Sequence, residues 1–296
     1  QGQPVCGRAG SSWNVAEPFF PKERLIILGG GHVALPVAEF GARVGFLVTV
    51  VDDRLSFANP GRFPMAEKVI CDDFGHAIEE LKIQESDYIC IVTRGHRHDA
   101  DCLRMIGKGK EPAYLGMIGS RRRVGIVKQE LLEEGYAPER MSRLKSPIGL
   151  KIGGVTPEEI AISILAEIIQ VKRMDREDKR VKNRSDLDFD VLKRLAEEPD
   201  ESKAVVTVIE SKGSSPRGAG AKMIVYRDGR ILGSIGGGCS EAAVLGEARS
   251  LIGSGRYKVV HVDLTGEAAE DEGMVCGGIM DVLVEDFATD REPCDR

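Results

Sequence analysis

The stretch RLIILGGGHVA, residues 24–34, decides the fold of the first half of the chain. The apolar run Leu25–Leu28 predicts a buried strand, and three glycines follow it directly before a helical pattern. Gly29 and Gly31 fit the pattern G-x-G-x-x-A, in which a glycine-rich turn lets backbone N–H groups approach a diphosphate at a helix N-terminus. We therefore expect Gly29, Gly31 and His32 to contact a phosphate-bearing cofactor.

An acidic residue follows the second expected strand, the position at which nucleotide-binding domains use a carboxylate to contact ribose. Phe46–Val51 predicts the second strand, and Asp52 follows at its end. A carboxylate at this place can accept hydrogen bonds from ribose hydroxyls, so we expect Asp52 to contact the cofactor and NAD or another nucleotide to be a candidate ligand. The alternative is a doubly wound domain that has lost its nucleotide.

The pattern of strands and helices continues through the first half of the chain. Apolar strands that alternate with helices indicate a parallel sheet covered on both faces. We expect an α/β fold, with a Rossmann-like doubly wound parallel sheet over residues 22–174 and a smaller α+β domain after it. The further strands expected here are 69–71, 88–92 and 114–118, and the helices are 74–82, 97–107, 121–134 and 156–173.

Two more strand-to-helix turns carry polar side chains. Ser120 and Arg121 offer a hydroxyl and a guanidinium group that suit a phosphate, although an exposed basic helical turn is the alternative. His96, His98 and Asp99 could ligate a metal, but their spacing fixes no coordination geometry, and polar residues at the mouth of a cleft are the favoured interpretation.

The second half of the chain has a different composition. Residues 175–189 are rich in charged side chains, which cannot form a buried face, so we interpret them as a linker. The small domain is expected over 190–288, with a hairpin turn at Asp228-Gly229, and residues 289–296 as a tail.

Three glycine-rich segments of the small domain carry candidate ligand-binding groups. A hydroxyl or guanidinium group can donate hydrogen bonds to phosphate. A cysteine at a helix start is favoured as the thiolate by the helix dipole, and a thiolate can bind a soft metal such as molybdenum. For each cysteine alone, the alternative is a small buried residue. The candidates are Ser214, Ser215, Arg217, Gly237, Gly238, Cys239 and Cys276, and the cysteines expected in the core instead are Cys71, Cys90 and Cys102.

Composition excludes several classes of protein. The 296 residues carry 47 Asp+Glu against 41 Lys+Arg, a net charge of −6, which argues against nucleic-acid binding. No apolar run is long enough to cross a membrane. The seven cysteines lack a C-x-x-C pair and a disulfide spacing, which favours a reducing cytoplasm.

The N-terminal residues 1–21 resemble the end of the small domain. Val5-Cys6-Gly7 followed by residues 13–19 is similar to Val275-Cys276-Gly277 followed by residues 281–287. We interpret this segment as the last strand of a second small domain, with chance similarity as the alternative.

The motifs together resemble one family. GSSPRGAGAKM (213–223), GSIGGGCSEAAV (233–244) and GMVCGG (273–278) are similar to the small domain of the XdhC/CoxI family, and EPFFPKERLIILGGGHVA (17–34) and GMIGSRRR (116–123) to its Rossmann domain. The family order is reversed here, which suggests a piece of a small–Rossmann–small arrangement or a permuted member. Lys151 stands where members commonly have an acidic residue.

The resemblance implies a role in cofactor maturation. Family members are accessory proteins that bind molybdenum cofactor, as molybdopterin or its dinucleotide, protect it during sulfuration and insert it into a molybdenum hydroxylase. The implied partners are a cysteine desulfurase and the large subunit of the hydroxylase, and the reordered chain favours a homo-oligomer. An NAD-dependent oxidoreductase and a nucleotide-binding regulatory protein are the alternative functions.

Overall fold

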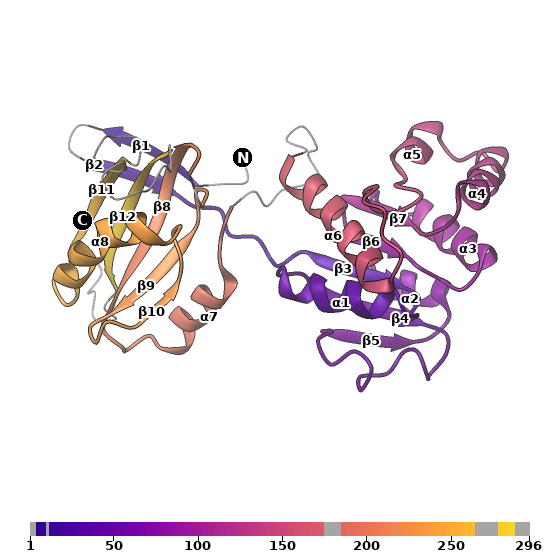
Figure 1. The fold of residues 1–296 in the computed structure, drawn as a ribbon, viewed down its shortest axis with the longest axis horizontal. Coiled ribbons are helices and arrows are strands. Elements are labelled where there is room, and N and C mark those ends of the chain that lie inside the picture. Colours follow the sequence, from indigo (N-terminus) through magenta and orange to yellow (C-terminus); the bar gives the residue numbers. More distant parts are fainter. Residues whose placement is uncertain (1–3, 10–11, 175–184, 216, 264–277, 288–296) are drawn as a thin grey trace. The chain divides into compact units, whose positions relative to one another are not determined.

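The computed structural model describes residues 4–9, 12–174, 185–215, 217–263 and 278–287. The chain divides into two compact units (Figure 1). One comprises Phe20–Lys182, and the other combines Gln1–Phe19 with Asn183–Arg296. No described helix is both long enough and apolar enough to span a membrane.

The first unit is a parallel α/β domain, as expected from the sequence. Its five strands lie in the order β5-β4-β3-β6-β7, and every pair is parallel. The strand order reverses between β3 and β6, which is the place where doubly wound sheets bind ligands at their carboxyl edge. The strands are β3 (Arg24–Leu28), β4 (Leu47–Asp52), β5 (Lys68–Cys71), β6 (Tyr88–Ile91) and β7 (Tyr114–Met117).

Helices cover both faces of this sheet. Leu25 and Ile27 of β3 pack with α1 (Ala34–Arg43) and α6 (Pro157–Met174), while Ile26 and Leu28 pack on the opposite face. This alternation follows from the two-residue period of a strand. The helices on the opposite face are α2 (Phe74–Leu81), α3 (His96–Gly107), α4 (Arg121–Glu133) and α5 (Pro138–Arg143).

The second unit contains an antiparallel sheet in the order β10-β9-β8-β12-β11. Helix α8 covers one face, where Val206, Met223 and Val282 form the core, and α7 packs on the other against Ile224 and Tyr226. The elements are α7 (Phe189–Glu197), β8 (Lys203–Gly213), β9 (Lys222–Tyr226), β10 (Ile231–Gly233), α8 (Gly238–Leu251), β11 (Tyr257–Asp263) and β12 (Gly278–Phe287).

The N-terminal residues form a hairpin that belongs to this second unit. β1 (Val5–Ala9) pairs antiparallel with β2 (Ser12–Ala16). Glu17 then forms an ion pair of 2.7 Å with Lys222, whose side chain is almost fully buried. Residues 1–21, interpreted from the sequence as a strand from a second small domain, thus contribute two strands that lie in the same unit as β8–β12.

Candidate functional site

The glycine turn between β3 and α1 is enclosed on two sides by protein backbone. A Cβ at Gly29, whose φ is +111°, would lie 2.6 Å from the carbonyl oxygen of Val92, and a Cβ at Gly30 would lie 2.3 Å from that of Phe57. A Cβ at Gly31 would meet no atom within 4 Å. Gly29 and Gly30 therefore allow close packing within the protein, and Gly31 is the glycine beside open space.

Asp52 lies at the end of β4 but its carboxylate is fully engaged by the protein. Oδ2 accepts hydrogen bonds from the Gly30 amide (2.8 Å) and from Arg54 Nη2 (3.0 Å). Oδ1 accepts from the Arg54 amide (3.0 Å) and from Arg54 Nε (2.8 Å). The residue is 1% exposed. Because a carboxylate has about four lone-pair positions, Asp52 in this structure holds the turn and Arg54, and does not offer the free acceptor for ribose that the sequence predicted.

The pKa of Asp52 reflects these contacts. Burial of the carboxyl group raises its pKa, but the hydrogen bonds from Arg54 and from the Gly30 amide lower it by more, so that the pKa lies below its usual value. Asp52 is therefore ionised at neutral pH and forms an ion pair with Arg54, whose side chain is partly exposed.

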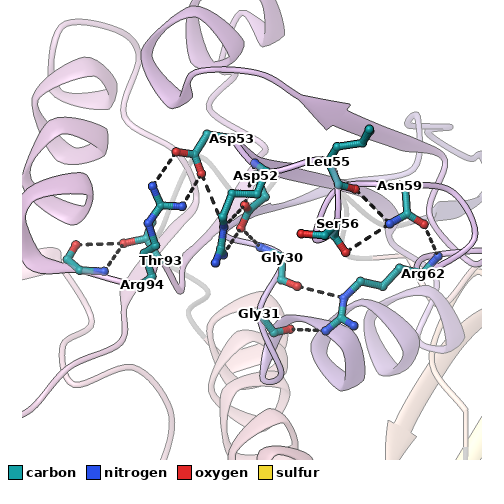
Figure 2. Close-up of polar contacts among 12 residues, drawn as sticks. Gly30, Gly31, Asp52, Asp53, Leu55, Ser56, Asn59, Arg62, Thr93 and Arg94 are labelled. Atoms are coloured by element: carbon teal, nitrogen blue, oxygen red, sulfur yellow. Dashed lines mark hydrogen bonds and ion pairs between the residues drawn. The ribbon is translucent and has the colours of Figure 1, made fainter.

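The segment after β4 folds over the glycine turn and carries a second arginine to it. Arg62 donates from Nε to the carbonyl oxygen of Gly30 (3.1 Å) and from Nη2 to that of Gly31 (3.3 Å). Asn59 fixes this segment, since its Oδ1 accepts from the Arg62 amide at 3.0 Å and its Nδ2 donates to the carbonyl oxygen of Leu55 at 3.1 Å. Figure 2 shows Arg62 held between Asn59 and the two glycines.

An ion pair crosses the carboxyl edge of the sheet at the same place. Arg94, which follows β6, donates to both carboxylate oxygens of Asp53, which follows β4, at 2.7 and 2.8 Å (Figure 2). β3 lies between those two strands. The pair therefore joins the loops on either side of the glycine turn.

The first turns of α3 and α4 meet at a buried carboxylate. Asp99 is 0% exposed and accepts hydrogen bonds from the Thr93 hydroxyl and from Arg123. Burial raises the pKa of the Asp99 carboxyl, against the opposing effects of Thr93 and Arg123. The Arg123 Nε atom is buried and has no hydrogen-bond partner among the described residues.

Ser120 and Arg121, which the sequence predicts to bind phosphate, lie at the start of α4. The Ser120 hydroxyl accepts a hydrogen bond from the Arg123 amide and caps the helix, while Arg121 is exposed to solvent. Of the metal-ligand candidates on α3, His98 lies against the Phe74 ring and Asp99 faces Arg123, while the His96 side chain lies outside the described residues. Among the described residues, no group of three or more His, Cys, Asp or Glu side chains is arranged to hold a metal.

In the small domain, the strand register brings the glycine-rich segments to one end of the sheet. Gly278 at the start of β12 lies opposite Gly213 at the end of β8. β9 runs antiparallel to β8 and begins opposite Thr207, and Gly233 at the end of β10 lies opposite Met223. The turns that follow β8 and β10 and the start of β12 therefore lie toward the same end of the sheet, with β8 running on to Gly213 beyond Val206, which is level with Gly233 through Met223.

The turn after β8 is ordered by an acidic residue from the segment before α7. Arg217 donates from Nε to a carboxylate oxygen of Asp186 at 2.6 Å, and the Gly218 amide donates to the same oxygen at 3.1 Å. The Ser215 hydroxyl donates to the Arg217 carbonyl oxygen at 2.8 Å, whereas Ser214 is exposed. Arg217 thus has a protein partner, and Ser214 is the hydroxyl that faces solvent.

The turn into α8 is held by Glu241. Its Oε1 accepts hydrogen bonds from the Ser234 hydroxyl (2.6 Å) and from the Gly237 amide (3.0 Å). Gly237 and Gly238 have φ values of +72° and +51°, a backbone region that favours glycine. The backbone of Cys239 lies in the first turn of α8. The Cys239 side chain and the whole of Cys276 lie outside the described residues.

Two family models match the chain. The XdhC Rossmann domain matches residues 25–168, and the XdhC and CoxI family matches residues 196–263. The chain belongs to the XdhC and CoxI family.

Relatives of this family member include proteins of Escherichia coli and Bacillus subtilis. It is 38% identical over 56% of its length to the uncharacterized protein YqeB of E. coli K12 and 34% identical over 52% to a probable xanthine dehydrogenase subunit of B. subtilis 168. It is 40% identical over 25% of its length to the molybdenum cofactor insertion chaperone PaoD of E. coli K12. The chain spans 30%, 44% and 23% of these three relatives, respectively.

One solved structure is also similar. A crystal structure described as a xanthine dehydrogenase from Bacillus halodurans is 33% identical, with a TM-score of 0.47, and the match covers 57% of this chain and 48% of that one.

Several side chains that order the glycine-rich turns of this family member could not be found from the sequence. Arg62, Asp186 and Glu241 each hydrogen-bond a glycine of a glycine-rich turn. Arg54 acts one step further away, by engaging Asp52, which accepts from the Gly30 amide. The expectation for cysteines needs one correction: Cys90 and Cys102 are buried, and burial raises the pKa of both thiols, but Cys71 is exposed. Cys71 ends β5, the edge strand of the described sheet, which pairs with β4 alone.

Proposed function

We propose that this chain is a molybdenum cofactor maturation factor. It holds the cofactor, supports its sulfuration and inserts it into a molybdenum hydroxylase of the xanthine dehydrogenase or carbon monoxide dehydrogenase type. Membership of the XdhC and CoxI family supports this role. So do the names of two relatives, a molybdenum cofactor insertion chaperone and a probable xanthine dehydrogenase subunit.

The observation that carries the proposal is the position of the glycine-rich turns toward one end of the small-domain sheet. Phosphate binds well where backbone amides, hydroxyls and a helix N-terminus come together. Ser214 and the Gly237–Gly238 turn at the start of α8 lie toward this end of the sheet, after β8 and β10. In the proposed complex these groups hold the phosphate end of the cofactor, and Arg217 orders the turn through Asp186 and adds positive charge.

In the proposed complex, the two cysteines of the glycine-rich segments lie at the molybdenum end of the cofactor. Cys239 begins α8, where the helix dipole favours the thiolate form, and thiolates are the ligands that soft metals prefer. Cys276 comes two residues before β12, which starts toward the same end of the sheet. We propose that one or both thiolates contact molybdenum or its exchangeable sulfur while the cofactor is held.

The partners follow from this role. The chain would deliver its cargo to the large subunit of a molybdenum hydroxylase, receive sulfur with the help of a cysteine desulfurase, work in the cytoplasm, and pair with a second copy of itself. An NAD-dependent oxidoreductase and a nucleotide-binding regulator remain alternatives, but the saturated carboxylate of Asp52 disfavours the usual NAD contact.

Cofactor retention tests the proposal. The chain is incubated with molybdenum cofactor under anaerobic, reducing conditions and desalted, and bound molybdenum and pterin are measured. We expect retention by the parent chain, reduced retention by Cys239→Ala or Cys276→Ala, and parent-like retention by Cys71→Ala, which removes an exposed thiol of the other unit. No retained cofactor in the parent chain would rule out the carrier role. Equal retention and sulfuration in both cysteine variants would rule out only the thiol role.

A further inference from the structure

The arginines around the Rossmann glycine turn point to the kind of ligand this domain takes. Arg54 and Arg62 come from the segment after β4, and both guanidinium groups lie near the Phe57 ring, at 3.8 and 5.4 Å from its centroid. Each is fixed by hydrogen bonds through the same edge, Nε and Nη2. Among the described residues, Nη1 of either group has no hydrogen-bond partner in the structure, which leaves a donor edge available to a ligand.

The arginines around the Rossmann glycine turn outnumber the carboxylates that pair with them. Arg54 is paired with Asp52, and Arg94 with Asp53. Arg62 is bound by two carbonyl oxygens, and no carboxylate partner for it occurs among the described residues. Three guanidinium groups against two carboxylates leave one positive charge beside Gly31, where the turn is open, and at the N-terminus of α1, which has no side-chain cap.

The same arrangement disfavours a ribose diol. A diol at the end of β4 is recognised by a free carboxylate, and Asp52 has no free oxygen lone pair in this structure. Its place toward the ligand is taken by the Arg54 guanidinium, which is one-third exposed. A fixed guanidinium binds phosphate oxygens through charge-assisted hydrogen bonds.

We propose that Arg54 and Arg62 form a phosphomonoester subsite at the glycine turn. The preferred ligand of this domain would then carry a terminal phosphate dianion in place of a bare ribose diol. Two sources share that chemistry: a nucleotide with a 2′-phosphate, and the plain pterin form of the molybdenum cofactor, whose phosphate is a monoester. This inference rests on the proposed function only in assuming that the glycine turn receives a phosphate-bearing ligand.

Arg62 is the stronger test position because its removal leaves no buried charge unpaired. Its partners are carbonyl oxygens, and Asn59 holds the surrounding backbone through the Arg62 amide, which the substitution keeps. Arg54 is replaced by Lys, since loss of its charge would leave Asp52 buried without a counter-ion. Arg43 at the end of α1, whose side chain is 73% exposed, provides the control Arg43→Gln.

The experiment compares ligand pairs that differ by the phosphomonoester. Calorimetry on the whole chain measures NADP⁺ against NAD⁺, and equilibrium dialysis measures molybdopterin against its cytosine dinucleotide. We expect the phosphomonoester member of at least one pair to bind about tenfold more tightly or better, and the pair identifies the source. Arg62→Gln and Arg54→Lys should each remove most of that ratio, while Arg43→Gln keeps it.

Three results would overturn the subsite. These are equal affinity within both pairs, an unchanged ratio in Arg62→Gln and Arg54→Lys, and failure of all four ligands to bind. Retention of molybdenum cofactor by the parent chain, measured separately, reports on the proposed function. A chain that retains cofactor and shows no phosphomonoester preference would therefore contradict the subsite alone.

Discussion

Asp53 and Arg94 form a two-pronged ion pair, with distances of 2.7 and 2.8 Å, that joins the loops after β4 and β6. The pair spans the glycine turn of β3, at the point where the strand order of the sheet reverses. Ligands of doubly wound folds bind at this point. The ion pair therefore bridges the two loops that flank the glycine turn, where the phosphomonoester subsite is proposed.

This ion pair should contribute little to stability. Both side chains are partly exposed, at 28% and 43%, and exposed pairs contribute about 0.2–1 kcal/mol. A double-mutant cycle of Asp53→Asn and Arg94→Gln, followed by urea unfolding, should give a coupling free energy within that range that falls with added salt. A coupling well above it, independent of salt, would mean that the pair is a structural brace.

Asp52 should contribute stability that depends on pH. Its pKa in the folded chain lies below the usual value of 3.8, so the ionised form favours folding above that value, and the contribution is lost as the pH falls through the folded pKa. We expect Asp52→Asn to lower the free energy of unfolding by about 2 kcal/mol at pH 7. The difference from the parent chain should shrink as the pH falls from 5 toward 3.

Urea unfolding across this pH series measures the effect. Asp101→Asn, at a side chain that is 54% exposed, serves as the control and should change stability little. A cost of Asp52→Asn that stays constant from pH 7 to pH 3 would show that the carboxylate charge is not what stabilises the turn.

Gly30 and Gly31 should respond in opposite ways to the same substitution. A Cβ at Gly30 would meet the Phe57 carbonyl oxygen at 2.3 Å, so Gly30→Ala forces the backbone to move and should cost about 2 kcal/mol or more. Gly31→Ala has open space around it and should change stability by about 0.5 kcal/mol or less, yet weaken ligand binding. Thermal unfolding and binding, measured on both variants, separate the two roles. Equal losses of stability would contradict them.

Glu241 should contribute to stability and to cofactor retention because it fixes the glycine turn at the start of α8. Glu241→Ala removes the acceptor for the Ser234 hydroxyl and the Gly237 amide and should cost about 1–2 kcal/mol, together with a loss of cofactor retention. Glu241→Gln keeps an acceptor oxygen and should retain more of both properties. Parent-like retention in Glu241→Ala would show that the order of this turn is irrelevant to the cargo.

The architecture could be predicted from sequence because local patterns determine it. Leu25–Leu28 before the glycines, and Thr156-Pro157 with Glu159 at the start of α6, define element ends through residues that are adjacent in the chain. The helices expected at 74–82 and 121–134 agree with α2 and α4 to within one residue at each end. The Asp228-Gly229 signal marks the turn between β9 and β10, which pair antiparallel.

The hydrogen-bond partners of the polar side chains could not be predicted from local sequence in the same way. Asp52 was the expected ribose acceptor, but whether its oxygens are free depends on where Arg54 turns and on how closely Gly30 approaches. Arg62 reaches glycines that lie about thirty residues earlier, and Asp186 reaches Gly218 across a similar separation. Such contacts depend on tertiary packing, for which a sequence window contains no signal.

This chain is proposed to carry molybdenum cofactor to a hydroxylase. The most direct measurement preloads the chain anaerobically with sulfurated cofactor, removes free cofactor, adds apo-xanthine dehydrogenase or apo-carbon monoxide dehydrogenase, and follows hydroxylase activity and the transfer of molybdenum. We predict activation of at least one apo-enzyme together with loss of molybdenum from the carrier, faster than with free cofactor at the same concentration. No activation of either enzyme, with the cofactor still bound to the chain or never bound to it, would contradict the account.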